Sequence, residues 1–168
     1  ESEVINRFEE LEPKRRYTAK NLKDEKSFIR HYDSKSDKAQ LEILKLLIHN
    51  SSLVRKVTLS LLDNKLCYNI VKTIKDNLGN YNNVAQLLEH IGDSPEQRNL
   101  VASLAVDIPE KDNEAAILSD CIETLEKISI KNEIDRIRNK IRIIEDSGKV
   151  APKSIVLELI NLQKKNSK

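Results

Sequence analysis

Residues 118–144, LSDCIETLEKISIKNEIDRIRNKIRII, decide how the chain is organised. Apolar side chains recur every three or four residues along this stretch, which is the spacing of one face of an α-helix. The spacing breaks once, because the step from Ile128 to Ile130 is two residues, a rotation of about 200° around a helix. The apolar residues before and after this step therefore face different sides: first Leu118, Cys121, Leu125 and Ile128, then Ile130, Ile134, Ile137, Ile141 and Ile144.

Two structures fit this change of face. A continuous helix would pack its first half on one body and its second half on another, or the helix breaks at Ser129. Ser147 and Gly148 end the pattern, and Pro152 opens a last helix. The apolar stripe of that helix can pair with Ile137, Ile141 and Ile144, and it consists of Ile155, Leu159 and Leu162. We therefore predict a C-terminal antiparallel helical hairpin.

The preceding residues predict a bundle of shorter helices. Apolar residues at helical spacing indicate helices within 41–48, 53–62, 66–78, 84–91 and 95–105. The last of these starts at Ser94 and Pro95, and Gln97 three residues after the serine predicts a capping box. Further upstream, short helices are expected within 4–11 and 22–29. The predicted organisation is a linker or N-terminal extension over 1–35, a bundle over 36–121, and a connecting helix with the hairpin over 122–168.

The composition supports an all-α class. The 168 residues include 3 Gly and 4 Pro, too few for the many turns of a β-sandwich or barrel. The two cysteines cannot form a disulfide scaffold or a four-ligand zinc site, and no apolar run is long enough for a membrane span. We expect a cytoplasmic protein without membrane contact. Because the sequence begins with Glu1 rather than Met, we expect a fragment of a longer protein.

No motif of catalysis or cofactor binding is present in the sequence. It contains no glycine-rich phosphate loop, no G-x-S-x-G, no H-E-x-x-H and no C-x-x-C. Its three histidines lie in different segments, and both cysteines fall on apolar helical faces, where a cysteine acts as a small hydrophobic residue. We therefore predict no catalytic residues, no cofactor and no metal for this chain.

The last helix carries more apolar residues than one hairpin contact can bury. Six of the eight residues from Ile155 to Leu162 are apolar, whereas a hairpin buries a single stripe. Val156 and Ile160 lie off that stripe, so something else must cover them. The bundle and a partner protein are both open possibilities.

Three segments carry a resemblance to a known family. They are KAQLEILKLL at 38–47, NLVASLA at 99–105, and LINLQKK at 159–165, which ends the hairpin after a long connecting helix. This order resembles the C-terminal helicase-binding domain of bacterial DNA primase, over about residues 36–168. The resemblance implies that the hairpin docks on the N-terminal domains of the hexameric replicative helicase and couples primer synthesis to the replication fork. It also implies that the bundle modulates the helicase.

Carried onto this chain, the resemblance implies a docking surface at the hairpin bend, residues 142–152, and on the last helix. The partner-binding residues are then Arg142, Glu145, Lys149, Pro152, Val156, Ile160, Gln163 and Lys164. The fragment itself is not expected to be an enzyme, although its parent would be a DNA primase, a DNA-directed RNA polymerase.

Two other interpretations remain open at this point. The N-terminal domain of the replicative helicase resembles the same bundle-plus-hairpin plan, but a linker and an ATPase follow that domain, whereas this chain ends in a basic tail. A helical nucleic-acid-binding module could use the basic stretch from Lys14 to Arg30, but the net charge of +2 and the scarcity of aromatics argue against it. We favour the primase domain.

Overall fold

The computed structural model describes residues 32–81, 83–109 and 113–166. Every helix described below belongs to one compact unit, residues 34–168. The short helices predicted within 4–11 and 22–29, and the basic stretch from Lys14 to Arg30, lie outside the described residues.

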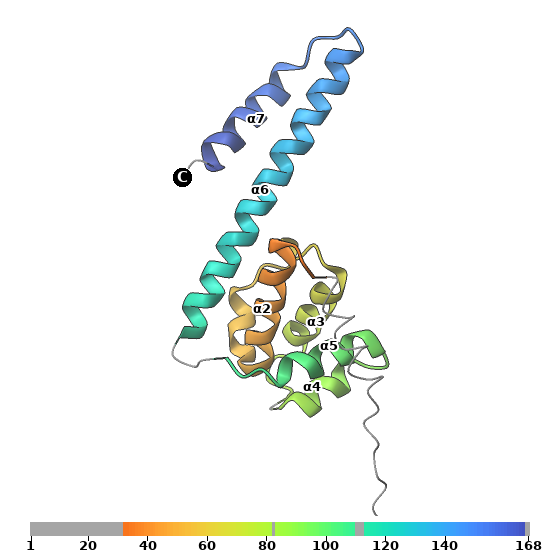
Figure 1. The fold of residues 1–168 in the computed structure, drawn as a ribbon, viewed down its shortest axis with the longest axis vertical. Helices are drawn as coiled ribbons and strands as arrows, with labels where there is room; N and C mark the ends of the chain where they lie inside the picture. Colours follow the sequence, from red (N-terminus) through yellow and green to blue (C-terminus); the bar gives the residue numbers. More distant parts are fainter. Residues whose placement is uncertain (1–31, 82, 110–112, 167–168) are drawn as a thin grey trace, which may run out of the picture. The chain divides into compact units, whose positions relative to one another are not determined.

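The fold is all-helical, with no strand among the described residues, so the predicted all-α class is confirmed. Short helices form a bundle, and a long helix and a last helix form an antiparallel hairpin (Figure 1). The elements are α2 (Lys35–His49), η2 (Ser51–Lys56), η3 (Leu59–Leu61), α3 (Lys65–Asp76), α4 (Val84–His90), α5 (Pro95–Ala105), α6 (Glu114–Asp146) and α7 (Lys153–Asn166).

Helix α2 forms the centre of the bundle. Ser34 caps its start, because the serine Oγ accepts a hydrogen bond from the Asp37 backbone N–H at 3.0 Å. The helix contacts α3, α5, α6 and η2. The helix therefore buries aliphatic side chains on most of its sides. The buried ones are Ala39, Ile43, Leu44, Leu46, Leu47 and Ile48.

One polar side chain, Gln40, is fully buried in α2. Its amide nitrogen donates to the Ser36 Oγ at 3.0 Å and to a carboxylate oxygen of Asp63, and its amide oxygen accepts from the Asn64 backbone N–H at 3.0 Å. The Asn64 side chain in turn caps α3 by accepting from the backbone N–H groups of Leu66 and Cys67. Gln40 thus fixes the start of α3 against α2.

The helix predicted within 53–62 is wrong as a single element. The structure has the short 3-10 segments η2 and η3 instead, separated by extended backbone at Val57 (φ −92°, ψ 125°) and Thr58 (φ −91°, ψ 116°). Both are β-branched residues, which favour extended backbone. Leu53, Val54 and Val57 are nevertheless buried, so this segment satisfies the apolar pattern without a regular helix.

Helix α5 begins where the sequence predicted, with Ser94 at the N-cap and Pro95 in the first turn. The predicted capping box is wrong, because the Ser94 side chain makes no cap hydrogen bond. The turn before the helix is held instead by Arg98, whose guanidinium donates to the Gly92 carbonyl oxygen at 3.2 Å.

Helix α6 runs without interruption from Glu114 to Asp146, so of the two alternatives the continuous helix is found and the break at Ser129 is not. The helix contacts α2 and η3 on the bundle and α7 in the hairpin. Leu125 and Ile134 are both buried, although their separation of nine positions places their side chains about 180° apart around the axis. The change of face therefore corresponds to one helix that packs on two bodies.

Polar contacts fasten α2 to the segment that follows α5 and the end of α2 to the start of α6. The Lys45 ammonium donates to the Asp107 carboxylate at 2.9 Å, and the Asn50 side-chain amide donates to the Glu114 carboxylate at 2.7 Å. The Asp107 bond is the main reason that the pKa of Lys45 is raised.

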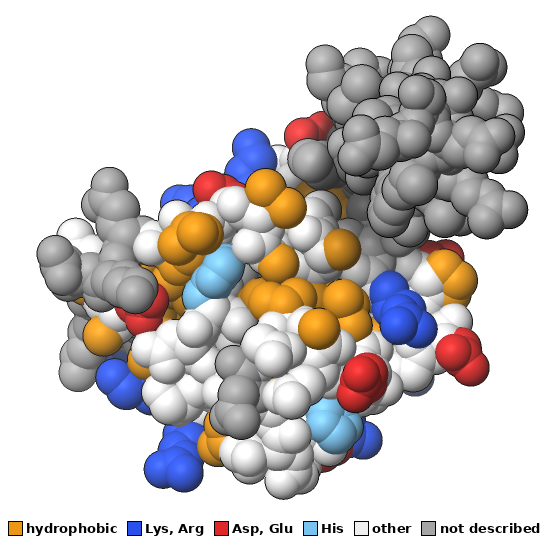
Figure 2. All heavy atoms as spheres, turned by 90° about the horizontal axis from the view of Figure 1, so that it is seen from below, with side chains coloured by type: hydrophobic (Ala, Val, Ile, Leu, Met, Phe, Trp, Pro, Cys, Tyr) orange, Lys and Arg blue, Asp and Glu red, His pale blue; other side chains and the backbone are white. Residues whose placement is uncertain are grey.

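Figure 2 shows hydrophobic side chains gathered near the middle of one face, with charged side chains spread around them.

Candidate functional site

The hairpin bend is built by the end of α6. The Gly148 backbone N–H donates to the Glu145 carbonyl at 2.8 Å, and the Lys149 backbone N–H donates to the Ile144 carbonyl at 3.2 Å. This pair of bonds is a Schellman motif, which places its glycine in the left-handed region, and Gly148 has a φ of 75°. The chain can therefore turn sharply and begin α7 at Lys153.

Helix α7 has no fully buried residue. The residues of its predicted stripe, Ile155, Leu159 and Leu162, are half-buried, and α6 is the main helix that it contacts. Val156 is 37% exposed and Ile160 is 39% exposed. The bundle therefore leaves these two side chains partly open to solvent.

The two ends of the predicted docking surface lie at different places on the hairpin. Arg142, Glu145, Lys149 and Pro152 are exposed around the bend. The other four, Val156, Ile160, Gln163 and Lys164, follow one side of α7 over eight residues, about 12 Å along the helix. The structure thus brings the eight residues together in two groups of four.

Three further large apolar residues of the hairpin are exposed, although none of them is among the residues predicted to bind the partner. Ile143 is 68% exposed, Val150 is 92% exposed and Leu157 is 59% exposed. Ile143 and Leu157 lie off the apolar stripes, and Val150 lies in a turn, where an aliphatic residue has no helical reason to be apolar. An apolar residue outside every stripe is the signal that could have found them.

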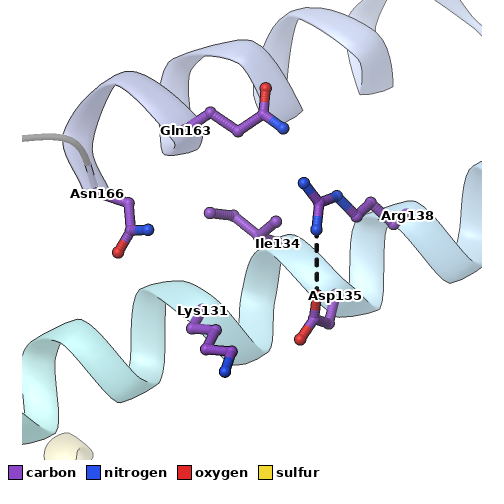
Figure 3. A pocket seen from close by; sticks show the side chains of 6 residues that line it. All are labelled: Lys131, Ile134, Asp135, Arg138, Gln163 and Asn166. Carbon is purple, nitrogen blue, oxygen red and sulfur yellow. Dashed lines mark ion pairs between the residues drawn. The ribbon is translucent and has the colours of Figure 1, made fainter.

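A shallow groove lies between α6 and α7 at the end of the hairpin away from the bend. Gln163 and Asn166 of α7 face Lys131 and Ile134 of α6 across it (Figure 3). Asp135 and Arg138 also line the groove and form an ion pair at 3.5 Å. Gln163 therefore lies where the apolar side of α7 meets a polar groove.

The charges of the hairpin are balanced within α6. The Arg136 guanidinium donates to both carboxylate oxygens of Glu133, at 2.6 and 2.8 Å. This hydrogen bonding lowers the pKa of Glu133 and raises the pKa of Arg136. Such exposed ion pairs contribute little to stability. They keep this surface of α6 polar and do not cover the apolar side chains of the hairpin.

The described residues hold neither an activated thiol nor a group of side chains that could bind a metal ion. Burial raises the pKa of the Cys67 thiol to about 12 and also raises that of Cys121, so both thiols are poor nucleophiles. No group of three or more His, Cys, Asp and Glu side chains in the described part of the chain could hold a metal ion. None of the described helices is long and apolar enough to cross a membrane. An exposed apolar row between charged residues is suited to protein docking.

The comparisons with known proteins agree with this geometry. The family described as DNA primase DnaG DnaB-binding matches residues 40–152, which include most of the bundle, all of α6 and the bend. The match ends before α7. No curated protein and no solved structure matches the chain.

Proposed function

The chain belongs to the DnaB-binding family of the DNA primase DnaG, and from this membership we propose that its hairpin is the surface that docks on the helicase. The family explains why the described residues form a docking body without a reaction centre. It also favours the primase domain over the N-terminal domain of the helicase. The chain then binds the N-terminal domains of the hexameric helicase and couples primer synthesis to the fork.

The observation that carries this proposal is the uncovered apolar row of the hairpin. Val156 and Ile160 are adjacent on α7, four residues apart, and Leu157 is more exposed than either. Aliphatic side chains surrounded by charged residues are typical of the centre of a protein interface. We assign the centre of the contact to Val156 and Ile160, with Gln163 and Lys164 beside them.

The residues at the bend supply the rest of the proposed contact. Arg142, Glu145, Lys149 and Pro152 are exposed on the same bend as Val150. Charged side chains at the rim of an interface mainly set the association rate and the choice of partner. We therefore assign orientation and specificity to the bend, and affinity to α7.

Each of the three segments of the chain has a role in this proposal. Residues 36–121 form the bundle that modulates the helicase, residues 122–168 form the connecting helix and docking hairpin, and residues 1–35 form a linker or extension. The parent enzyme is a DNA primase that acts in the bacterial cytoplasm. The polymerase activity belongs to the parts of that enzyme that precede this domain.

The test compares two matched pairs of aliphatic residues. The docking pair, Val156→Ala and Ile160→Ala, truncates the proposed centre, and the control pair, Val106→Ala and Ile108→Ala, truncates a Val and an Ile that are 84% and 72% exposed beside the bundle. Binding to the cognate helicase is measured by isothermal calorimetry. Circular dichroism verifies that both variants stay helical.

The expected loss follows from the exposed fractions. Full burial of a Val or Ile side chain is worth about 1.5–3 kcal/mol. Covering the remaining 37% and 39% then contributes roughly 1–2 kcal/mol for the pair. The docking pair should therefore weaken binding by roughly 5- to 30-fold, and the control pair by less than about twofold. Equal losses in the two pairs would refute the assignment to α7.

A further inference from the structure

The solvent face of α3 carries three lysines. Lys65, Lys72 and Lys75 are all exposed, and spacings of seven and three residues place them along one side of the helix. The opposite side is apolar and buried, with Cys67, Ile70, Val71 and Ile74 in the core. Asp76 is the one acidic residue of the helix, so α3 is basic within a chain whose net charge is only +2.

These lysines differ from the cations of α6. Four cations of α6 lie within 4.0 Å of an acid three or four residues away, in the pairs Lys127–Glu123, Arg136–Glu133, Arg138–Asp135 and Arg142–Asp146. Within the described residues, no carboxylate lies within 4.0 Å of the ammonium groups of Lys65, Lys72 or Lys75. The positive charge of α3 is therefore available to an outside anion.

An aromatic ring lies among these charges. Tyr68 is three residues after Lys65 and four before Lys72, so it shares their side of α3, and its side chain is half-exposed. The three lysines span ten residues, about 15 Å along the helix, roughly the length of four stacked nucleotides. Phosphate-binding lysines with a ring on which a base can stack are the elements of single-strand binding.

We propose that this face of α3 binds single-stranded nucleic acid, with phosphates on Lys65, Lys72 and Lys75 and a base stacked on Tyr68. An acidic peptide fits less well. The described residues offer no strand edge to which a peptide could add, and the face presents lysines rather than the arginine forks that recognise carboxylates in pairs.

This inference is independent of the hairpin. Helix α3 contacts α2, α5, η2 and η3, whereas α7 contacts α6. A domain held on the helicase by its hairpin could therefore still hold a nucleic-acid strand on its bundle. The two proposals can fail separately, because each depends on different residues.

The test measures binding of the full chain to fluorescein-labelled oligo-dT and oligo-rU of about 20 nucleotides, by anisotropy at several salt concentrations between about 50 and 200 mM. The α3 variant carries Lys65→Gln, Lys72→Gln and Lys75→Gln. The charge-matched control carries Lys38→Gln, Lys127→Gln and Lys140→Gln, which are exposed lysines on other helices. Comparison of the two oligonucleotides tells whether DNA or RNA is preferred.

The α3 variant should bind more than tenfold more weakly near 50 mM salt, and its plot of log K against log salt should be less steep by about 2, since three phosphate contacts are lost. The control should stay within about twofold of the native chain. Tyr68→Ala should weaken binding by at least about fivefold with an unchanged salt slope, and Tyr68→Phe should retain it.

Three results would overturn the proposal. They are no binding by the native chain, equal losses in the α3 variant and the control, or competition by an Asp/Glu-rich peptide as effective as that by unlabelled oligo-dT. An unchanged circular dichroism spectrum and thermal unfolding midpoint verify that the α3 variant is folded. Should the triple variant not fold, the Tyr68→Ala and Tyr68→Phe pair gives the same decision.

Discussion

Replacement of Gln40 gives a sharp test of the bundle core. This side chain is fully buried, and it joins α2 to the segment that starts α3 through Ser36, Asp63 and Asn64. Gln40→Leu keeps a similar volume but removes every polar contact of the side chain. The expected effect is therefore a loss of hydrogen bonding without a large cavity.

The size of the loss depends on which partners stay unsatisfied. The Asn64 backbone N–H is part-buried and loses its acceptor, which costs about 1–3 kcal/mol. Asp63 is exposed, so water can replace the Gln40 amide at its carboxylate. Gln40→Leu should therefore lower the free energy of unfolding by about 2 kcal/mol.

Urea denaturation followed by circular dichroism measures this difference. Gln40→Glu is the matched comparison, because it keeps an acceptor for Asn64 but places a second carboxylate beside Asp63. That repulsion raises the pKa of the new carboxyl in the folded state, so stability is lost as the pH rises above its unfolded value of about 4.3. Stability of Gln40→Leu equal to or above that of the native chain would refute the reasoning.

Further predictions concern the thiols and the hairpin bend. At neutral pH a thiol reagent should modify half-buried Cys121 before Cys67, which is fully buried, and quantitative thiol labelling of single-cysteine variants verifies the order. Because the pKa of Cys67 is raised from 9.0 to about 12, the unfolded chain loses this proton first, and Cys67→Ser should weaken the decline of stability between those two pH values. Gly148→Ala should destabilise the hairpin by about 1 kcal/mol, since alanine disfavours a φ of 75°, and thermal unfolding measures this; an unchanged midpoint would contradict it.

The sequence predicted the helices with long apolar periods and missed the details that packing decides. The change of face between Ile128 and Ile130 is a property of spacing alone, so it could be read before the structure was known. The spacing could not show whether the helix breaks there. A continuous α6 requires that each of its two apolar faces packs on another element, and these are the bundle on one side and α7 on the other. The helix predicted across Val57 and Thr58 does not form because both are β-branched residues that favour extended backbone, a preference that the helical spacing of their apolar neighbours does not show.

The candidate site was predictable in part for the same reason. The surplus of apolar residues on α7 is visible in the sequence, but the exposure of Val156 and Ile160 depends on where the bundle ends along α6. The spacing of four and seven residues to Leu44 and Leu47 places Gln40 on their apolar side of the helix. The polar partners that let this side chain be buried, such as the Asn64 backbone N–H, come from a segment far along the chain and could not be read from the spacing.

The weak burial of α7 predicts where the chain changes most on binding the helicase. This helix is held by three half-buried residues, Ile155, Leu159 and Leu162, whereas α2 is held by a fully buried core. A segment with few buried contacts opens locally at low free-energy cost, so its amide hydrogens exchange fast. A partner that covers Val156 and Ile160 binds only when α7 is folded against α6. Its binding free energy therefore stabilises the folded α7 and slows that exchange. Hydrogen exchange with and without helicase should therefore show the largest slowing in residues 153–166 and little change in α2. A complex that forms while exchange in α7 stays unchanged would place the contact elsewhere on the domain.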